Sequence, residues 1–284
     1  MTIESKATPG SAAPATDPTV PAPTSTGSGV TRVIGLLAIV ATVFLALLGL
    51  WWTPPDFVQD ESVRILYIHV PSATLAYVGC FLTTIGSVMY LWKKSQWWEL
   101  VAYASAEIAA VFTALTLVTG SLWGRPTWGV FWVWDARLTS SAMLFLLLLG
   151  YLAVRRLPAD YTVRAKRAAI VGLLLVPNVI IVRQSVDWWR TLHQEASLFA
   201  DGPGATIEGL MLFALFFGFV TFGLIFAWLL IHRFRVAWLE EQVAGQGLSA
   251  AIAERRAEAT GTVSAPSAPE PAGGPARPND EVTP

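Results

Sequence analysis

The sequence contains few charged residues. Only 14% of its 284 residues are Asp, Glu, Lys or Arg, whereas a soluble domain usually carries about 25%. So few charges cannot cover a water-facing surface, and the mean hydropathy is +0.53, so a soluble globular protein is excluded. The formal net charge of −1 gives no reason to expect nucleic acid as a partner.

Cysteine is almost absent as well. The one cysteine, Cys80, lies inside an apolar run, so the chain forms no intramolecular disulfide, and a thiolate metal site is not expected. We interpret Cys80 as a small buried hydrophobic residue. A Walker phosphate-binding motif is also missing, so this chain is not expected to hydrolyse ATP.

Apolar residues are scarce at both ends of the chain. Residues 1–30 are mostly Pro, Ser, Thr, Ala and Gly, a composition that cannot bury enough surface to offset the entropy of ordering. From about residue 257 the chain is again rich in Pro, Ala, Gly and Glu. We therefore predict a disordered tail over residues 1–30 and a largely disordered tail over residues 241–284.

Between the tails, residues 31–240 contain long apolar runs. A membrane core of about 30 Å is crossed by about 20 helical residues, and backbone groups in lipid must pair within their own segment. The sequence therefore predicts an all-α, polytopic membrane domain with six transmembrane helices, the fifth of them kinked at Pro177. The six runs are 33–52, 70–92, 100–122, 138–154, 168–182 and 209–231.

Basic residues are distributed unevenly over the predicted loops. When the loops are assigned alternately to two sides, 14 of the 19 Lys and Arg residues fall on the side that holds both termini. The positive-inside rule makes that side cytoplasmic, which predicts a multi-pass protein of the cytoplasmic (inner) membrane. The outer loops are then residues 53–69, 123–137 and 183–208.

Tryptophan is concentrated on the predicted outer side. Eight of the 13 Trp residues lie at or near that face, and the second outer loop reads W-G-R-P-T-W-G-V-F-W-V-W-D-A-R-L-T over residues 123–139, here called the Trp-rich segment. A membrane-interface belt needs one or two aromatic anchors per helix end, which is enough for Trp51 and Trp52. The Trp-rich segment exceeds that need, and predicts a surface for a large, flat, apolar ligand such as heme.

Two histidines flank this segment on the same predicted side. His69 follows the first outer loop, and His193 lies in the third. A neutral imidazole is a good axial ligand for heme iron, and two of them can occupy both axial positions. A single His near a membrane interface is more often a structural hydrogen-bonding residue, but two histidines beside a Trp-rich surface favour a heme site.

Charged residues on the outer side could complete such a site. Arg guanidinium groups suit carboxylates, and heme has two propionates. Arg64 and Arg137 are candidates, although pairing with nearby acids such as Asp135 is the simpler alternative. Glu107 lies inside the third apolar run. A carboxylate there costs free energy in a membrane, so Glu107 suggests a functional role. It could be a protonated acid, or it could be hydrogen-bonded within the bundle.

The Trp-rich segment resembles the WWD motif of heme-handling membrane proteins. The span from Pro54 to about Glu240 is similar to the CcmC family, the heme exporter protein C of cytochrome c maturation. Further stretches carry this resemblance: Pro54-Pro55-Asp56, V-R-I-L-Y-I-H-V-P over 63–71, residues 119–139, and S-V-D-W-W-R-T-L-H-Q over 185–194.

The resemblance implies a site and a set of partners. It implies heme b bound by the WWD segment, with His69 and His193 as axial ligands. It also implies work in membrane lipid with ABC-transporter ATP-binding and permease subunits (CcmA and CcmB), a small membrane protein (CcmD) and a periplasmic heme chaperone (CcmE). The predicted heme-binding set is His69, His193, Trp123, Trp128, Trp132, Trp134, Asp135, Arg137 and Arg64.

The sequence departs from the family pattern in its long tails, at Glu107 and at two motif positions. Phe131 stands where Trp is common, which keeps an aromatic face and removes an N–H donor. The order Pro177-Asn178-Val179 replaces the usual Asn-Val-Pro, which predicts a shifted kink in the fifth helix.

We therefore expect a heme-binding and heme-delivery protein rather than an enzyme. Three alternatives remain open at this stage. A heme lyase or synthase would share the WWD motif, but this chain lacks the extra helices of the larger synthases. A b-type electron carrier would normally hold its His ligands within helices. A permease for heme would need polar spans, and apart from Glu107 the spans carry few polar residues.

Overall fold

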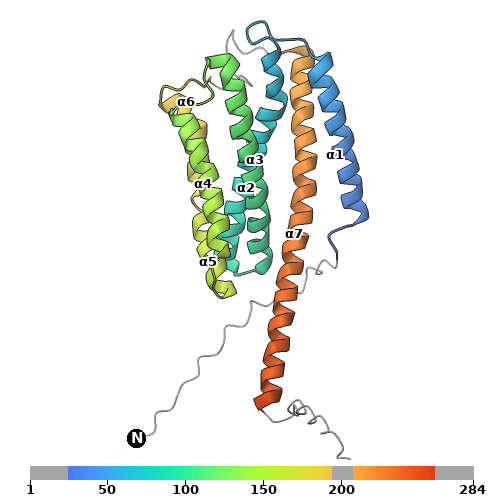
Figure 1. Cartoon of the computed structure of the whole chain (residues 1–284), viewed down its shortest axis with the longest axis vertical. Helices are drawn as coiled ribbons and strands as arrows, with labels where there is room; N and C mark the ends of the chain where they lie inside the picture. Colours follow the sequence, from blue (N-terminus) through green and yellow to red (C-terminus); the bar gives the residue numbers. More distant parts are fainter. Residues whose placement is uncertain (1–24, 194–206, 260–284) are drawn as a thin grey trace, which may run out of the picture. The chain divides into compact units, whose positions relative to one another are not determined.

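The computed structural model describes residues 25–193 and 207–259. The chain forms two compact units, residues 1–239 and 240–284. The first unit is a bundle of long helices (Figure 1). The described part of the second unit is the C-terminal stretch of the last helix. The predictions for residues 1–24 and 260–284 of the tails lie outside the described residues.

Six helical segments are long and apolar enough to cross a membrane. The described residues contain no strand, so the prediction of an all-α protein with six spans is confirmed. A turn of π-helix at Leu48–Trp52 extends the first helix, and a 3₁₀ turn at Glu61–Ile65 precedes the second. The helices are α1 Gly29–Leu47, α2 Leu66–Lys93, α3 Gln96–Trp128, α4 Ala136–Arg156, α5 Tyr161–Gly172, α6 Leu175–Trp188 and α7 Gly209–Ala259.

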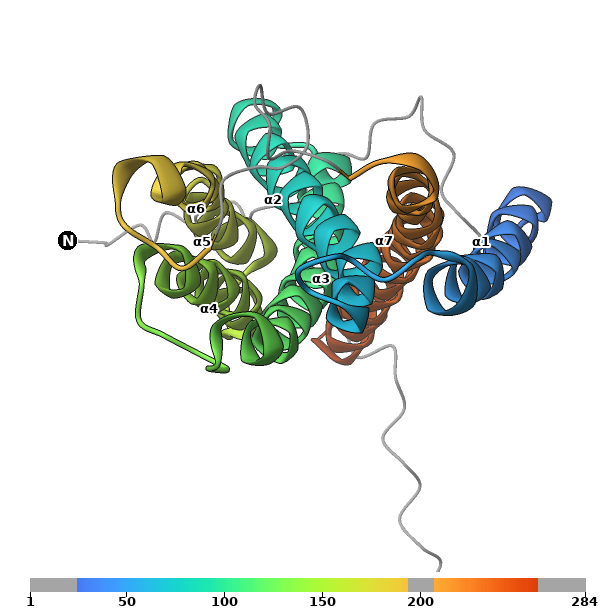
Figure 2. The same ribbon diagram turned by 90° about the horizontal axis from the view of Figure 1, so that it is seen from above.

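Helices α2 and α3 form the centre of the first unit. Figure 2 shows α4, α5 and α6 on one side of this pair and α7 followed by α1 on the other. Small residues allow α2 and α3 to approach closely, since a Cβ on Gly79 would lie 2.8 Å from the Cβ of Ala109. Small residues are the usual means of close helix packing in membranes.

The fifth span is broken rather than gently kinked. Pro177 has no N–H to donate to the carbonyl of Leu173 and its ring crowds that carbonyl, and the helix is interrupted between α5 and α6 at Leu173 and Leu174. The hydroxyl of Thr84 in α2 donates to the carbonyl of Gly172 at 2.8 Å. This bond satisfies a backbone group beside the break, as a membrane interior requires.

Three helices, α3, α6 and α7, extend further than the sequence predicted. The second outer loop was expected to span residues 123–137, but α3 continues to Trp128 and ends at Gly129, whose φ of 80° is the left-handed conformation that favours glycine. The connection between helices is therefore residues 129–135, and the third outer loop likewise begins with the last turn of α6. The C-terminal tail was predicted as largely disordered from residue 241, yet α7 is helical to Ala259. Residues 240–258 are rich in Ala, Glu, Gln and Arg, which have high helix propensity.

Candidate heme site

His69 lies in the first turn of α2, beside the outer end of α3. We use "outer end" for the end of the bundle that carries residues 129–135. The Nδ1 atom of His69 is 3.0 Å from the Oγ1 atom of Thr119. The ring of Trp123, one turn further along α3, meets the imidazole edge-on with ring centroids 5.7 Å apart. Both contacts come from the same face of α3, because residues 119 and 123 are four apart.

The first outer loop holds Trp123 in place. The indole Nε1 of Trp123 donates to the side-chain oxygen of Gln59 at 2.8 Å. The loop that carries Gln59 is internally bonded, since the Asp56 carboxylate accepts from the N–H groups of Val58 and Gln59 at 2.9 and 2.8 Å. An ordered loop thus fixes the orientation of an indole that contacts His69.

His193 lies against another Trp of the same helix end. The rings of Trp128 and His193 have centroids 6.0 Å apart and are tilted by 60°. His193 and Arg137 are both within electrostatic range of the His69 imidazole. The two predicted axial ligands therefore lie near one another at the outer end of α3, each beside a different Trp.

Asp135 links the second and third outer loops. Its Oδ1 atom accepts the N–H of Leu138 at 2.8 Å and so caps the N-terminus of α4. Its Oδ2 atom accepts the N–H of Leu192 at 3.0 Å, one residue before His193. Asp135 was predicted to bind the cofactor. In the structure its carboxylate joins the segment that carries His193 to the Trp-rich segment.

The connection between α3 and α4 presents aromatic rings with little cover. The Trp134 side chain is 82% exposed and that of Phe131 is 56% exposed. Trp132 packs edge-on against Trp134 at a centroid distance of 5.6 Å, and its indole N–H is buried without an acceptor among the described residues. Exposed rings together with an unused buried donor fit a flat ligand that has both an apolar face and polar substituents.

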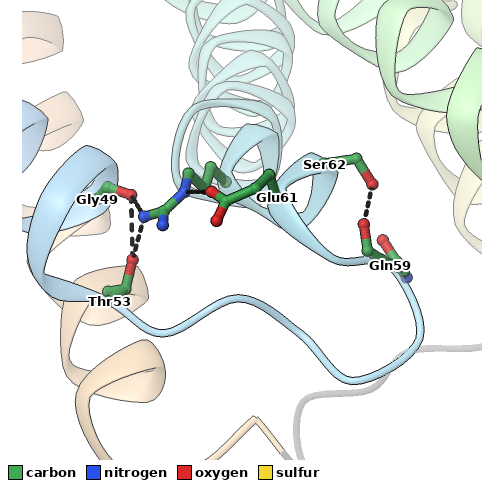
Figure 3. Close-up of polar contacts among 6 residues, drawn as sticks. Gly49, Thr53, Gln59, Glu61 and Ser62 are labelled. Carbon is green, nitrogen blue, oxygen red and sulfur yellow. Dashed lines mark hydrogen bonds and ion pairs between the residues drawn. The ribbon is translucent and has the colours of Figure 1, made fainter.

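The two candidate arginines differ in their surroundings. Arg64 is already bound within the first outer loop: it donates to the carbonyl of Gly49 at 2.5 Å and to Thr53 Oγ1 at 3.1 Å, and it pairs with Glu61 (Figure 3). Arg137 forms no ion pair within the described parts of the chain and is in electrostatic range of Asp135. Arg137 is therefore the more available guanidinium for a propionate.

Sequence reasoning did not identify three residues that contact the predicted site. Gln59 gives no signal, because its bond to Trp123 connects positions 64 residues apart. Thr119 and Gly120 could have been found, because helical spacing places Thr119 on the same face as Trp123. A Cβ on Gly120 would lie 2.9 Å from Cε1 of His69.

A family model described as heme exporter protein C (CcmC) matches residues 19–248. This match covers most of the chain. The chain belongs to the CcmC family. The resemblance to the CcmC family is thereby confirmed.

Relatives in bacteria and in plants support the same family. The heme exporter protein C of Bradyrhizobium diazoefficiens is 40% identical over 215 residues, which are 75% of this chain and 81% of the relative. That of Haemophilus influenzae is 40% identical over 195 residues, 68% of this chain and 78% of the relative. A protein of Marchantia polymorpha named as a putative cytochrome c biosynthesis ccmC-like mitochondrial protein is 41% identical over 181 residues, 64% of this chain and 76% of the relative.

Proposed function

We propose that this chain binds heme b at the outer face of the cytoplasmic membrane and hands it to a periplasmic heme chaperone during the maturation of c-type cytochromes. The names of the family and of its relatives support heme export and cytochrome c biosynthesis. The observation that carries the proposal is the approach of two histidines to the outer end of α3, where His69 contacts Trp123 and His193 contacts Trp128.

In this proposal each residue type has a separate task. His69 and His193 supply the two axial imidazoles. Trp123, Trp128, Trp132 and Trp134 provide apolar area and ring edges, and Arg137 pairs with a propionate. Heme brings the iron, and the protein binds, orients and partly covers it.

His193 is then the ligand that would leave the iron when heme is released. His69 belongs to a helix of the bundle, whereas His193 follows the end of α6 and is held by the bond between Leu192 and Asp135. In this proposal heme would then pass to the chaperone from His69. The ABC-type subunits CcmA and CcmB and the small protein CcmD are the proposed partners in this step. The proposed role of the chain is the handling and delivery of heme rather than catalysis.

The test is the optical spectrum of the purified full-length protein expressed with ample heme. We expect a six-coordinate spectrum for the wild type, and a lost or five-coordinate Soret band for His69→Ala and His193→Ala. The matched control is His232→Ala, because His232 packs against Trp228 in α7 and has no proposed ligand role. Identical spectra for all four proteins, or heme loss only in His232→Ala, would refute the ligand assignment.

A further inference from the structure

The His69 imidazole rests on one turn of α3, between a hydroxyl group and a glycine. Thr119 Oγ1 is 3.0 Å from the Nδ1 atom of the ring, and Thr119 itself is only 9% exposed. The next residue is Gly120, and a Cβ added there would lie 2.9 Å from Cε1 and 3.5 Å from Nδ1 of His69. The ring thus occupies the space that a side chain at position 120 would fill.

The single hydroxyl proton of Thr119 already has an acceptor. Thr119 Oγ1 donates to the carbonyl of Leu115 at 2.7 Å, the usual bond of a Thr to the carbonyl four residues earlier in a helix. A hydroxyl has one donor and two acceptor positions. The Leu115 carbonyl is nearer to Thr119 Oγ1 than Nδ1 of His69 is, 2.7 Å against 3.0 Å, and the carbonyl of Thr116 lies at 3.3 Å. We therefore assign the hydroxyl proton to the backbone, and the oxygen of Thr119 then accepts from His69.

The direction of this bond determines the tautomer of His69. If Thr119 accepts, Nδ1 must carry the proton, and in a neutral imidazole the other nitrogen, Nε2, then holds the free lone pair. Metal-binding histidines commonly donate their other N–H to such an acceptor, which fixes the tautomer and the ring orientation.

We propose that Thr119 and Gly120 act as positioning residues, which hold His69 in the Nδ1–H tautomer and leave Nε2 as the nitrogen available to iron. The part of this inference that concerns iron rests on the proposed heme function. The part that concerns the tautomer is a property of the protein without heme. Thr119 fixes the position of the proton, and Gly120 provides room for the ring against the helix.

The tautomer is tested first, on full-length apoprotein labelled with ¹⁵N-histidine in detergent. The chain has three His residues, so His193→Gln and His232→Gln are sufficient to assign the signals. We expect the ¹⁵N shifts of His69 to show a protonated Nδ1 and an unprotonated Nε2. Thr119→Val keeps the side-chain shape and removes the acceptor, so it should yield a mixture of tautomers, whereas Thr119→Ser should keep the wild-type signal. A wild-type His69 protonated at Nε2, or a Thr119→Val spectrum like the wild type, would overturn the proposal.

The effect on iron is tested by heme titration of the same variants. Losing a hydrogen-bond partner of a metal ligand typically weakens binding about 10–100-fold, and we expect a loss in this range for Thr119→Val with recovery in Thr119→Ser. Gly120→Ala should weaken binding by displacing the ring. Its control is Gly150→Ala in α4, where an added Cβ meets nothing within 4 Å. Unchanged affinity in Thr119→Val and Gly120→Ala would overturn the positioning role.

The two experiments separate failure of this inference from failure of the proposed function. If wild-type protein binds no heme but His69 has the Nδ1–H tautomer, the proposed function fails and the tautomer assignment stands. If heme binds through His69 and the apoprotein has the opposite tautomer, the proposed function stands and the roles of Thr119 and Gly120 are wrong. A purely structural Thr119 would change the thermal stability without changing the tautomer.

Discussion

At the scale of single residues, the predicted site depends on bonds that orient its aromatic rings. Trp123 contacts His69 and is itself fixed by the side-chain oxygen of Gln59. When a partly buried indole N–H loses its acceptor, the cost in free energy is about 1–3 kcal/mol. The orientation of Trp123 therefore depends on a residue from a different outer loop.

Replacing Gln59 should weaken heme binding without removing any proposed ligand. In Gln59→Met the side chain keeps its length and loses the acceptor for Trp123. We expect about a 5- to 150-fold loss of heme affinity, which corresponds to that free energy, with a six-coordinate spectrum still reached at saturation. Phe57→Ala, a change at a fully exposed position of the same loop, should have no effect. A Gln59→Met protein that binds heme as tightly as the wild type would show that Trp123 needs no such support.

Residue types and their order were sufficient to predict the ligand candidates but not their contacts. The outer position of His69, His193 and the Trp residues followed from span counting, and the structure brings them together at the end of α3. The engagement of Arg64 with Gly49 and Thr53 could not be predicted, because it depends on how a loop folds back over a helix end. No local pattern in the sequence encodes such a contact.

At the scale of helices, the half of the bundle opposite the outer end is held by ion pairs. Glu99 at the start of α3 pairs with Arg155 at the end of α4, and both side chains are less than 10% exposed. About two turns further along α3, Glu107 pairs with Arg233 of α7. Arg233 also donates to the hydroxyl of Tyr103 at 2.8 Å. The ring of Tyr103 lies between the two guanidinium groups, 3.9 Å from Arg155 and 5.0 Å from Arg233.

This arrangement explains Glu107, which the sequence marked as costly inside a span. Its carboxylate is hydrogen-bonded within the bundle, one of the two options that the sequence left open. Removing one partner of a fully buried pair costs about 3–5 kcal/mol. We expect a smaller loss of about 1–3 kcal/mol here, because about a quarter of each side chain is exposed.

A double-mutant cycle measures this link between α3 and α7. Glu107→Ala and Arg233→Ala should each lower the thermal unfolding temperature in detergent, since each leaves an unpaired charge. The double variant should be destabilised by clearly less than the sum of the two. Arg156→Ala, at an exposed position next to Arg155, serves as the control. Additive losses would show that the pair contributes no coupling.

The positions of the spans were predictable, whereas their ends were not. Apolar length alone indicated six spans, and Pro177 indicated the interruption that divides α5 from α6. The end of α3 was misplaced because Gly124 and Pro126 suggest a break, but the helix tolerates both and ends only at Gly129. Breaking signals in the last turns of a helix are ambiguous, because the final carbonyls lack helical partners in any case.

At the scale of the whole chain, the two ends of the bundle have different chemistry. One end carries the Trp-rich segment and both candidate ligands, and the other carries the interior ion pairs and most of the basic residues of the loops. The positive-inside rule predicts that the basic end faces the cytoplasm, and the proposed heme site would then face the periplasm, where its proposed recipient resides. Membership of the CcmC family is consistent with a protein that binds heme on one side and lets another protein take it.

The central claim is that two imidazoles, from His69 and His193, hold the iron. Electron paramagnetic resonance of the ferric heme complex of the full-length protein tests this most directly, because the signal reports the number and type of axial ligands. The account predicts a low-spin signal typical of two imidazole ligands, converted to a high-spin signal in His193→Ala. A wild-type complex that is wholly high-spin, or a low-spin signal that survives in His193→Ala, would contradict it.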